Sequence, residues 1–203
     1  MSKKKWALVG FTIGLIAFSG VFSWFMFFRH PWVSPLGVNP AIGLPLYDYS
    51  YNNKIAGFGQ ITPTYYHNGF DFAVNASTTF VAAHEAYVDG IRTWYNDKGG
   101  HWQTNVELWI NPQWTIEMAF ESWALNETYA NLQAGQILVS VGEHVMTNQS
   151  IGILQHFGDG SHVHFGVGTW GNYICPYDAF TASARATFVT QFYKVNTTTD
   201  WRM

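Results

Sequence analysis

Two short segments hold the residues with the clearest chemistry, residues 67–71 (HNGFD) and 161–165 (SHVHF). Together they supply three imidazoles and one carboxylate. Imidazole nitrogens and carboxylate oxygens are ligands that zinc accepts, and three protein ligands leave one coordination position open. An open position separates a catalytic zinc from a structural one. The residue types therefore predict a zinc hydrolase.

The spacing within each segment indicates how the side chains could converge. Residues 161–165 are typical of a strand, and side chains two apart on a strand share a face, so His162 and His164 would face one cleft. His67 and Asp71 lie on either side of Gly69, whose small size would let the backbone turn tightly. One histidine of the second segment would bind the metal, and the other would take a proton from water.

Short apolar runs separated by turn residues predict the elements that carry these segments. Many short strands at close spacing indicate an antiparallel sheet, open or partly closed, in a mainly β protein. The sequence NDKGG at residues 96–100 predicts a hairpin turn. The predicted strands are residues 70–74, 80–83, 86–92, 106–110, 115–120, 137–141, 151–154 and 163–167.

The region after the last strand changes to a helical period. Phe180, Ala184, Phe188 and Phe192 recur at every fourth residue, and Asp178 precedes them as a candidate N-cap. We expect a short C-terminal helix that packs on the sheet.

The N-terminal residues predict a membrane anchor. Residues 6–28 carry no charge, follow the lysines at 3–5 and precede Arg29. Such a run is long enough to span a bilayer, and the lysines would hold the N-terminus in the cytoplasm. A cleaved signal peptide, with residues 17–19 as a poor cleavage site, is the alternative. The expected localisation is the cell membrane, with a single pass and an extracytoplasmic C-terminal domain.

These features divide the chain into four parts. We expect a cytoplasmic tail and transmembrane helix in residues 1–29 and a catalytic domain in residues 63–180. A C-terminal helix and tail would occupy residues 181–203. The prolines and glycines of residues 30–62 fit either an extended stalk or irregular packing onto the domain.

Composition narrows the function classes. Only 11% of the residues are charged and the net charge is -3, which argues against a nucleic-acid partner because such proteins show a basic field. Cys175 is the only cysteine, so no internal disulfide forms.

From about Tyr65 to Tyr177 the sequence resembles the M23 zinc metallopeptidases of the lysostaphin and LytM type. The family pattern runs from His-x-Gly-x-Asp through a valine-alanine strand and an Asp-Gly turn to His-x-His-Phe. The resemblance implies that family's partly open β barrel. The matching blocks are residues 67–71, 80–83, 88–90, 141–145, 151–153, 162–165 and 175–177.

The resemblance also implies roles for individual residues. His67, Asp71 and His164 would be the ligands of Zn²⁺, and His162 would be the non-ligating imidazole that activates water. The implied substrate is a cell-wall or extracellular peptide, because most family members cut peptide bonds in cell-wall cross-links.

The sequence departs from the family at one catalytic position. The family carries a further histidine in a Tyr-x-His-Leu strand, and alignment of residues 116–121 places Phe120 there. Phenylalanine neither donates a proton nor stabilises an oxyanion. We hypothesise that His156, in the loop of residues 155–160, folds over the zinc as a substitute. Glu117 and Glu121 are further candidates.

The other histidines have no partner at metal-ligand spacing and are interpreted as structural: His84, His101 and His144. Two functions follow. The first is a membrane-anchored, outward-facing zinc endopeptidase. The alternative is a zinc-retaining, weakly active or inactive domain that binds envelope peptides or regulates another hydrolase. A carbohydrate-binding module, suggested by the ten tryptophans, explains none of the histidines.

Overall fold

The computed structural model describes residues 30–196 and residue 201. The predicted transmembrane anchor, residues 1–29, lies outside the described residues. Among those that are described, we find no helix with the length and apolar character needed to cross a bilayer.

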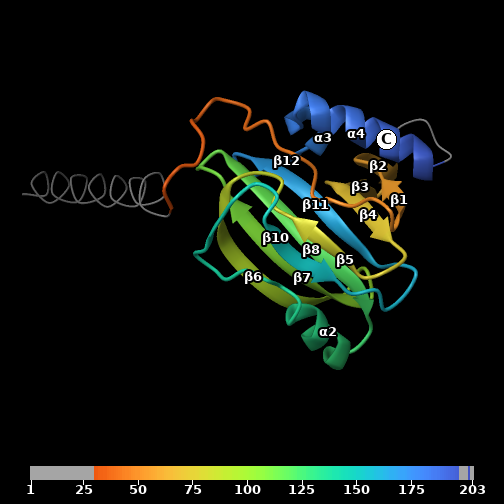
Figure 1. Cartoon of the computed structure of the whole chain (residues 1–203). Helices are drawn as coiled ribbons and strands as arrows, with labels where there is room; N and C mark the ends of the chain where they lie inside the picture. The colour runs from red at the N-terminus through yellow and green to blue at the C-terminus, as the bar shows by residue number, and fades with distance from the viewer. Residues whose placement is uncertain (1–29, 197–200, 202–203) are drawn as a thin grey trace, which may run out of the picture.

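One curled antiparallel sheet forms the body of the molecule, which confirms the prediction of a mainly β, half-open architecture (Figure 1). Its strand order is β1-β4-β11-β8-β7-β6-β9, and β12 pairs with β11. The bounds are β1 Asn52–Ala56, β4 Phe70–Val74, β6 Ala86–Asn96, β7 His101–Trp109, β8 Trp114–Ala124, β9 His144–Val145, β11 His162–Thr169 and β12 Asn172–Ile174. The predicted turn at residues 96–100 joins β6 to β7.

Two small sheets and three helices complete the described structure. β5 (Thr78–Val81) pairs with β10 (Ser150–Leu154), and β2 (Gly59–Thr62) pairs with β3 (Tyr65–His67). The helices are α2 (Glu127–Ala134), α3 (Pro176–Ala179) and α4 (Ala182–Val195). The sequence analysis missed α2, and its strand at residues 137–141 was wrong, because this segment makes only an isolated bridge at Ile137.

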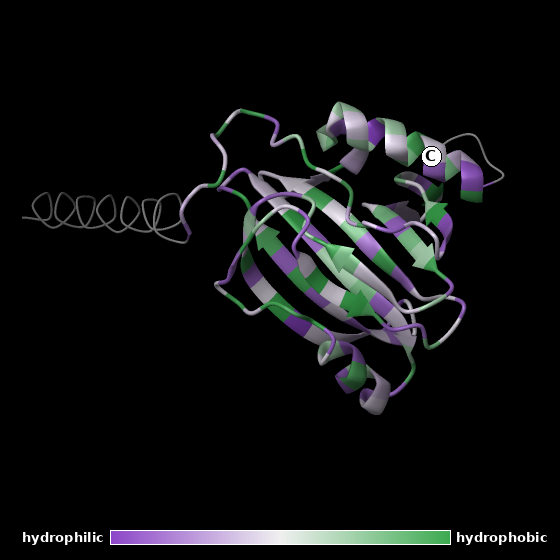
Figure 2. Cartoon of the chain, in the orientation of Figure 1, coloured by the Kyte–Doolittle hydropathy of each residue, from purple (hydrophilic) through white to green (hydrophobic). Residues whose placement is uncertain are grey.

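The two faces of the main sheet differ in character, as the alternating colours of the strands in Figure 2 show. Phe72, Phe120 and Val163 are neighbours across β4, β8 and β11 and are fully buried. The β5–β10 pair covers this face, where Phe80 packs edge-to-face on Phe120 with ring centroids 5.9 Å apart. Because side chains alternate along a strand, the residues between these positions point to the opposite, polar face.

The C-terminal helix forms as predicted but with a different cap. Thr181 is the N-cap of α4, and its side chain accepts a hydrogen bond from the Ala184 amide. The predicted cap, Asp178, lies in α3 instead. Phe188 stacks on Phe70 with ring centroids 4.6 Å apart, so α4 covers the end of the sheet where β4 begins.

Residues 30–62 pack on the domain and do not form a stalk. Ile42, Leu46 and Ile55 are buried in the main core, and β1 pairs with β4 at the edge of the sheet. The predicted boundary at residue 63 is therefore absent from the described chain, because the sheet already includes residues before it.

Candidate metal centre

Three of the predicted site residues bring one ligand atom each to a single point on the polar face. The Nε2 atom of His67 lies 3.0 Å from Oδ1 of Asp71 and 3.1 Å from Nδ1 of His164. The third edge, from His164 Nδ1 to Asp71 Oδ1, measures 2.9 Å. The sequence placed these residues on the two motifs, and the pairing of Asp71 with His164 across β4 and β11 unites them.

This triangle fits a tetrahedral metal ion. Zinc bonds of about 2.0–2.1 Å place neighbouring ligand atoms about 3.3 Å apart in a tetrahedron. The three observed edges, 2.9–3.1 Å, are close to that value and leave one face open. Two imidazole nitrogens and one carboxylate oxygen are also a donor set that zinc takes in catalytic sites.

Hydrogen bonding prepares the ligands for a cation. The Nδ1–H of His67 donates to the Gly57 carbonyl at 2.5 Å, which leaves the Nε2 lone pair for a metal, as outer hydrogen bonds do in known zinc sites. Burial raises the pKa of Asp71, but the hydrogen bonds from His164 and His67 outweigh it and hold this pKa below its ordinary value. Asp71 is therefore an anion, as a ligand must be.

Gly69 is needed for space. A Cβ atom there would lie 2.6 Å from Cε1 and Nε2 of His164 and 2.6 Å from the Phe165 carbonyl oxygen. Such contacts are far inside van der Waals distance, so any side chain at this position would displace the His164 ring. The glycine admits the ligand from the neighbouring strand, whereas the sequence analysis had assigned it to a tight turn.

His162 lies beside the triangle without joining it. Its Nδ1–H donates to the Gly160 carbonyl at 2.7 Å, so the neutral ring carries its lone pair on Nε2. Nε2 lies 3.8 Å from Oδ1 of Asp71, outside the ligand triangle. Burial lowers the pKa of His162, but Glu121 and Asp71 raise it to about 9. This placement matches the predicted role of a non-ligating imidazole.

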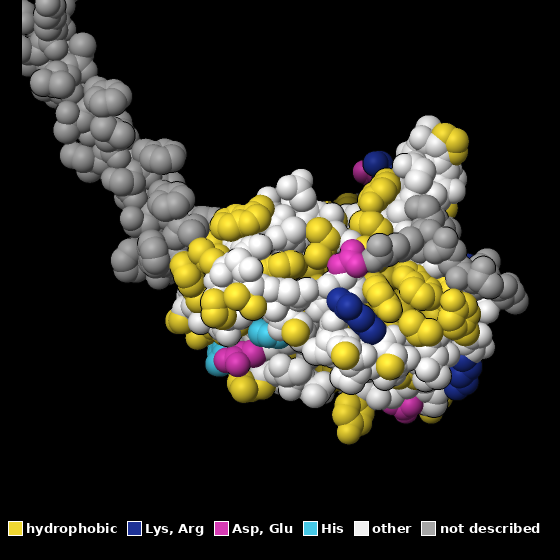
Figure 3. Space-filling model, turned by 90° about the horizontal axis from the view of Figure 1, so that it is seen from above, with side chains coloured by type: hydrophobic (Ala, Val, Ile, Leu, Met, Phe, Trp, Pro, Cys, Tyr) yellow, Lys and Arg dark blue, Asp and Glu magenta, His cyan; other side chains and the backbone are white. Residues whose placement is uncertain are grey.

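A cleft of about 370 Å³ opens onto these residues. Tyr65 and the β6–β7 hairpin form its walls, and a smaller cavity of about 170 Å³, lined by Lys54 and Asp159, adjoins Asp71 and His162 from another side. The face shown in Figure 3 carries few charged side chains, in keeping with the low charge of the sequence. The cleft is lined by Tyr65, His67, Asp71, Asn96, Lys98, Gly99, His101, Glu121, His162 and His164.

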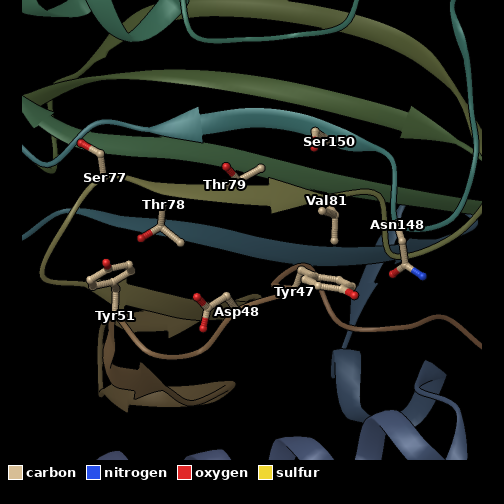
Figure 4. Close-up of a pocket in the computed structure, with 9 residues that line it drawn as sticks. All are labelled: Tyr47, Asp48, Tyr51, Ser77, Thr78, Thr79, Val81, Asn148 and Ser150. Atoms are coloured by element: carbon tan, nitrogen blue, oxygen red, sulfur yellow. The ribbon is translucent and has the colours of Figure 1, made fainter.

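A larger cavity, of about 450 Å³, lies elsewhere (Figure 4). Tyr47, Asp48 and Tyr51 face β5 across it, and its lining contains no histidine. Its size exceeds that of the cleft, but only the cleft combines metal ligands with an additional imidazole. Chemistry therefore assigns the candidate site to the smaller space.

The residues of β8 occupy different environments from one position to the next. Phe120 is fully buried in the core and points away from the cleft. Glu121 is paired with His162 across the sheet and lines the cleft. Glu117 lies further along β8, where it accepts hydrogen bonds from Asn105 and Tyr173. The alignment of Phe120 with the family's histidine stays a prediction.

The structure does not bring His156 into the cleft. This residue follows β10, is not among those that line the site, and donates its backbone N–H to Ser77 at 3.3 Å. Of the histidines interpreted as structural, His144 pairs with Glu85, and His84 donates to the Glu85 carbonyl.

His101 is the cleft residue that the sequence analysis missed. It begins β7, directly after the predicted hairpin turn, and its Nε2 donates to Glu121 at 2.5 Å. The turn sequence indicated that a strand would start here, but the facing of the first residue depends on strand register.

No protein-family model and no curated protein sequence matches the chain. Among solved structures, it is similar to a zinc-containing peptidase from Vibrio cholerae, at 20% identity and a TM-score of 0.48, over 66% of this chain and 38% of that one. A putative M23 peptidase from Pseudomonas aeruginosa matches at 17% identity and a TM-score of 0.47, over 76% and 56%. The mutant catalytic domain of the prophage-encoded M23 protein EnpA from Enterococcus faecalis matches at 16% and 0.47, over 66% and 94%. This chain thus spans less than two thirds of the first two proteins, and two of the three are M23 proteins, the family that its motifs resemble.

Proposed function

We propose that this chain is a zinc metalloendopeptidase that hydrolyses peptide bonds in cell-envelope material. The observation that carries the proposal is the triangle of ligand atoms from His67, Asp71 and His164, with a further imidazole beside it. When bound there, zinc would polarise the substrate carbonyl and lower the pKa of a water molecule. The M23-like motifs support a peptide of the cell-wall cross-link type as substrate.

His162 would move the proton in this reaction. Its Nδ1 is occupied by the Gly160 carbonyl, so Nε2 is the atom that accepts the proton of the attacking water. The same nitrogen would return the proton to the departing amine. We further propose that the uncharged run at residues 6–28 anchors the chain and holds this domain outside the membrane.

A second function rests on one observation about β8. This strand brings a carboxylate, Glu121, to the cleft and no imidazole. The second candidate is therefore a zinc-retaining domain without turnover that binds envelope peptides or regulates another hydrolase.

The experiment compares the zinc-loaded full-length chain with His162→Ala in cleavage of a Gly-Gly-containing wall peptide. His144→Ala is the matched control, because this histidine is exposed and lies on β9, outside the cleft. We expect cleavage by the wild type and by His144→Ala, and a loss of about a hundred-fold or more in His162→Ala. Zinc binding without cleavage of this or other envelope peptides would favour the second function.

A further inference from the structure

Beside the metal triangle, the cleft holds a buried row of three ionisable groups that ends at His162. The Nε2–H of His101 donates to Oε2 of Glu121 at 2.5 Å. The same carboxylate oxygen lies 3.5 Å from Nε2 of His162. The side chains of His101 and Glu121 are only 4% and 12% exposed, so solvent does little to weaken their interaction.

The hydrogen bonds of His101 define its charge. Nδ1 donates to the Gly99 carbonyl at 3.0 Å, so both ring nitrogens face acceptors. A ring that donates from both nitrogens is the cationic imidazolium. Burial lowers the pKa of His101, but the Glu121 carboxylate and the Gly99 carbonyl outweigh burial and raise it. His101 and Glu121 therefore form a cation–anion pair.

The surrounding residues fix this pair in place. The Trp123 ring stacks on His101 with centroids 4.7 Å apart, and its backbone adopts a positive φ of 60°, which L residues rarely do. On the other side, Gly160 passes so close that a Cβ atom there would lie 2.4 Å from the Trp123 ring. A strained residue of this kind persists only where its neighbours determine its position, and such residues cluster at active sites.

We propose that Glu121, held by His101, positions His162 and stabilises the charge that His162 gains during proton transfer. This inference rests on the proposed peptidase function. As the water oxygen bonds to the carbonyl carbon, the water proton passes to Nε2 of His162. When the C–N bond breaks, that proton passes to the amine nitrogen.

Between these two steps, Nε2–H of His162 faces a carboxylate, which favours the imidazolium form as in other catalytic triads. Neither Glu121 nor His101 touches the reacting atoms, so both are positioning residues. His101 is needed because a half-buried carboxylate without its cationic partner would protonate or turn away from His162.

The test measures kcat, KM and zinc content in zinc-loaded full-length chains carrying Glu121→Gln, His101→Gln or both. We expect one zinc per chain throughout, little change in KM, and a fall in kcat of about ten- to a hundred-fold in each single variant. Because the two residues act as a unit, the double variant loses no more than the weaker single variant. Glu121→Asp, which restores the carboxylate, recovers part of kcat. Glu85→Gln is the matched control, since it breaks a Glu–His pair on the surface and leaves kcat unchanged.

A second readout does not depend on turnover. In ¹⁵N-resolved NMR of the full-length chain, the Nε2 proton of His101 should resonate at low field and disappear in Glu121→Gln but not in Glu85→Gln. Its absence from the wild type would overturn the pairing. Unchanged kcat in both single variants, or additive losses in the double variant, would overturn the positioning role while hydrolysis itself stands. A wild type that binds zinc and cleaves nothing would instead refute the proposed function, and the role with it.

Discussion

At the scale of single residues, the candidate centre depends on three ligand atoms that come from different strands. His67 ends β3, Asp71 is the second residue of β4, and His164 lies opposite Asp71 on β11. The alternation of side chains along β11 brings His162 to the same face, and the strand pairing then supplies Glu121. Each polar group lies where its strand register requires.

Gly69→Ala tests the packing of the ligands. The added methyl group would overlap the His164 ring, so we expect a loss of about 1–3 kcal/mol in the free energy of unfolding and weaker zinc binding. Thermal unfolding and a zinc titration measure the two effects. Gly90→Ala is the control, since its Cβ would meet nothing closer than 3.5 Å. Equal effects in both variants would contradict the steric account.

The Glu121–His101 pair should give stability a distinct pH dependence. Burial raises the pKa of Glu121, but the hydrogen bonds from His101 and His162 lower it to about 2, so its contribution is lost as the pH falls below its ordinary value of 4.5. The pKa of His101 is raised, so its contribution is lost as the pH rises above 6.5.

We therefore expect the difference in melting temperature between wild type and Glu121→Gln to be largest between about pH 4.5 and 6.5. The measurement uses the full-length chain with a chelator present, so that bound metal does not contribute. A difference that stays constant from pH 3 to 9 would contradict the ion pair.

At the scale of elements, local patterns predicted most strands and both site motifs, while register limited the rest. Residues 70–74 and 163–167 were recognisable as strands, and the spacing of His162 and His164 placed them on one face. β8 was harder, because a shift of one residue exchanges the faces of a strand. Phe120 enters the core and Glu121 the cleft, and no local property of the sequence decides between them.

His101 and α2 show the same limit in other ways. His101 reaches the cleft only after β7 pairs with β8 through a register shift between Trp102 and Thr104, which no short motif encodes. α2 covers one end of β7 and β8 but buries only Ala130 and Gln133, so its apolar pattern was too weak to recognise.

Phe120→Ala separates a core role from a role in the site. Phe120 packs on Phe80 between the two sheets, so we expect a loss of about 3–5 kcal/mol in the free energy of unfolding. Zinc stoichiometry of the folded fraction should stay unchanged, because the side chain points away from the ligands. Chemical denaturation and metal analysis give the two values. Loss of zinc without loss of stability would place Phe120 in the cleft instead.

At the scale of the whole molecule, the fold places a polar centre on a sheet whose other face is the apolar core. α4 and the segment before β1 close the end of that core around Phe70, the residue immediately before Asp71. Metal binding should therefore stabilise the entire domain rather than one loop. The sequence division into a stalk and a separate domain missed this, because isolated apolar residues such as Ile42 and Leu46 show their partners only in the folded chain.

Zinc at a hundred times its dissociation constant would add about 2.7 kcal/mol to the free energy of unfolding. For a chain of this size, the melting temperature should rise by about 5–10 °C. Calorimetry of the full-length chain with and without zinc measures the shift, and Asp71→Asn should show almost none. An equal shift in Asp71→Asn would indicate that zinc binds elsewhere.

The central claim is that His67, Asp71 and His164 hold one zinc ion. Its most direct test is the zinc content of the purified full-length chain after dialysis, measured beside Asp71→Asn and beside His144→Ala as the control. The account predicts one zinc per chain in the wild type and in His144→Ala, and almost none in Asp71→Asn. No zinc in the wild type, or equal zinc in all three proteins, would contradict it.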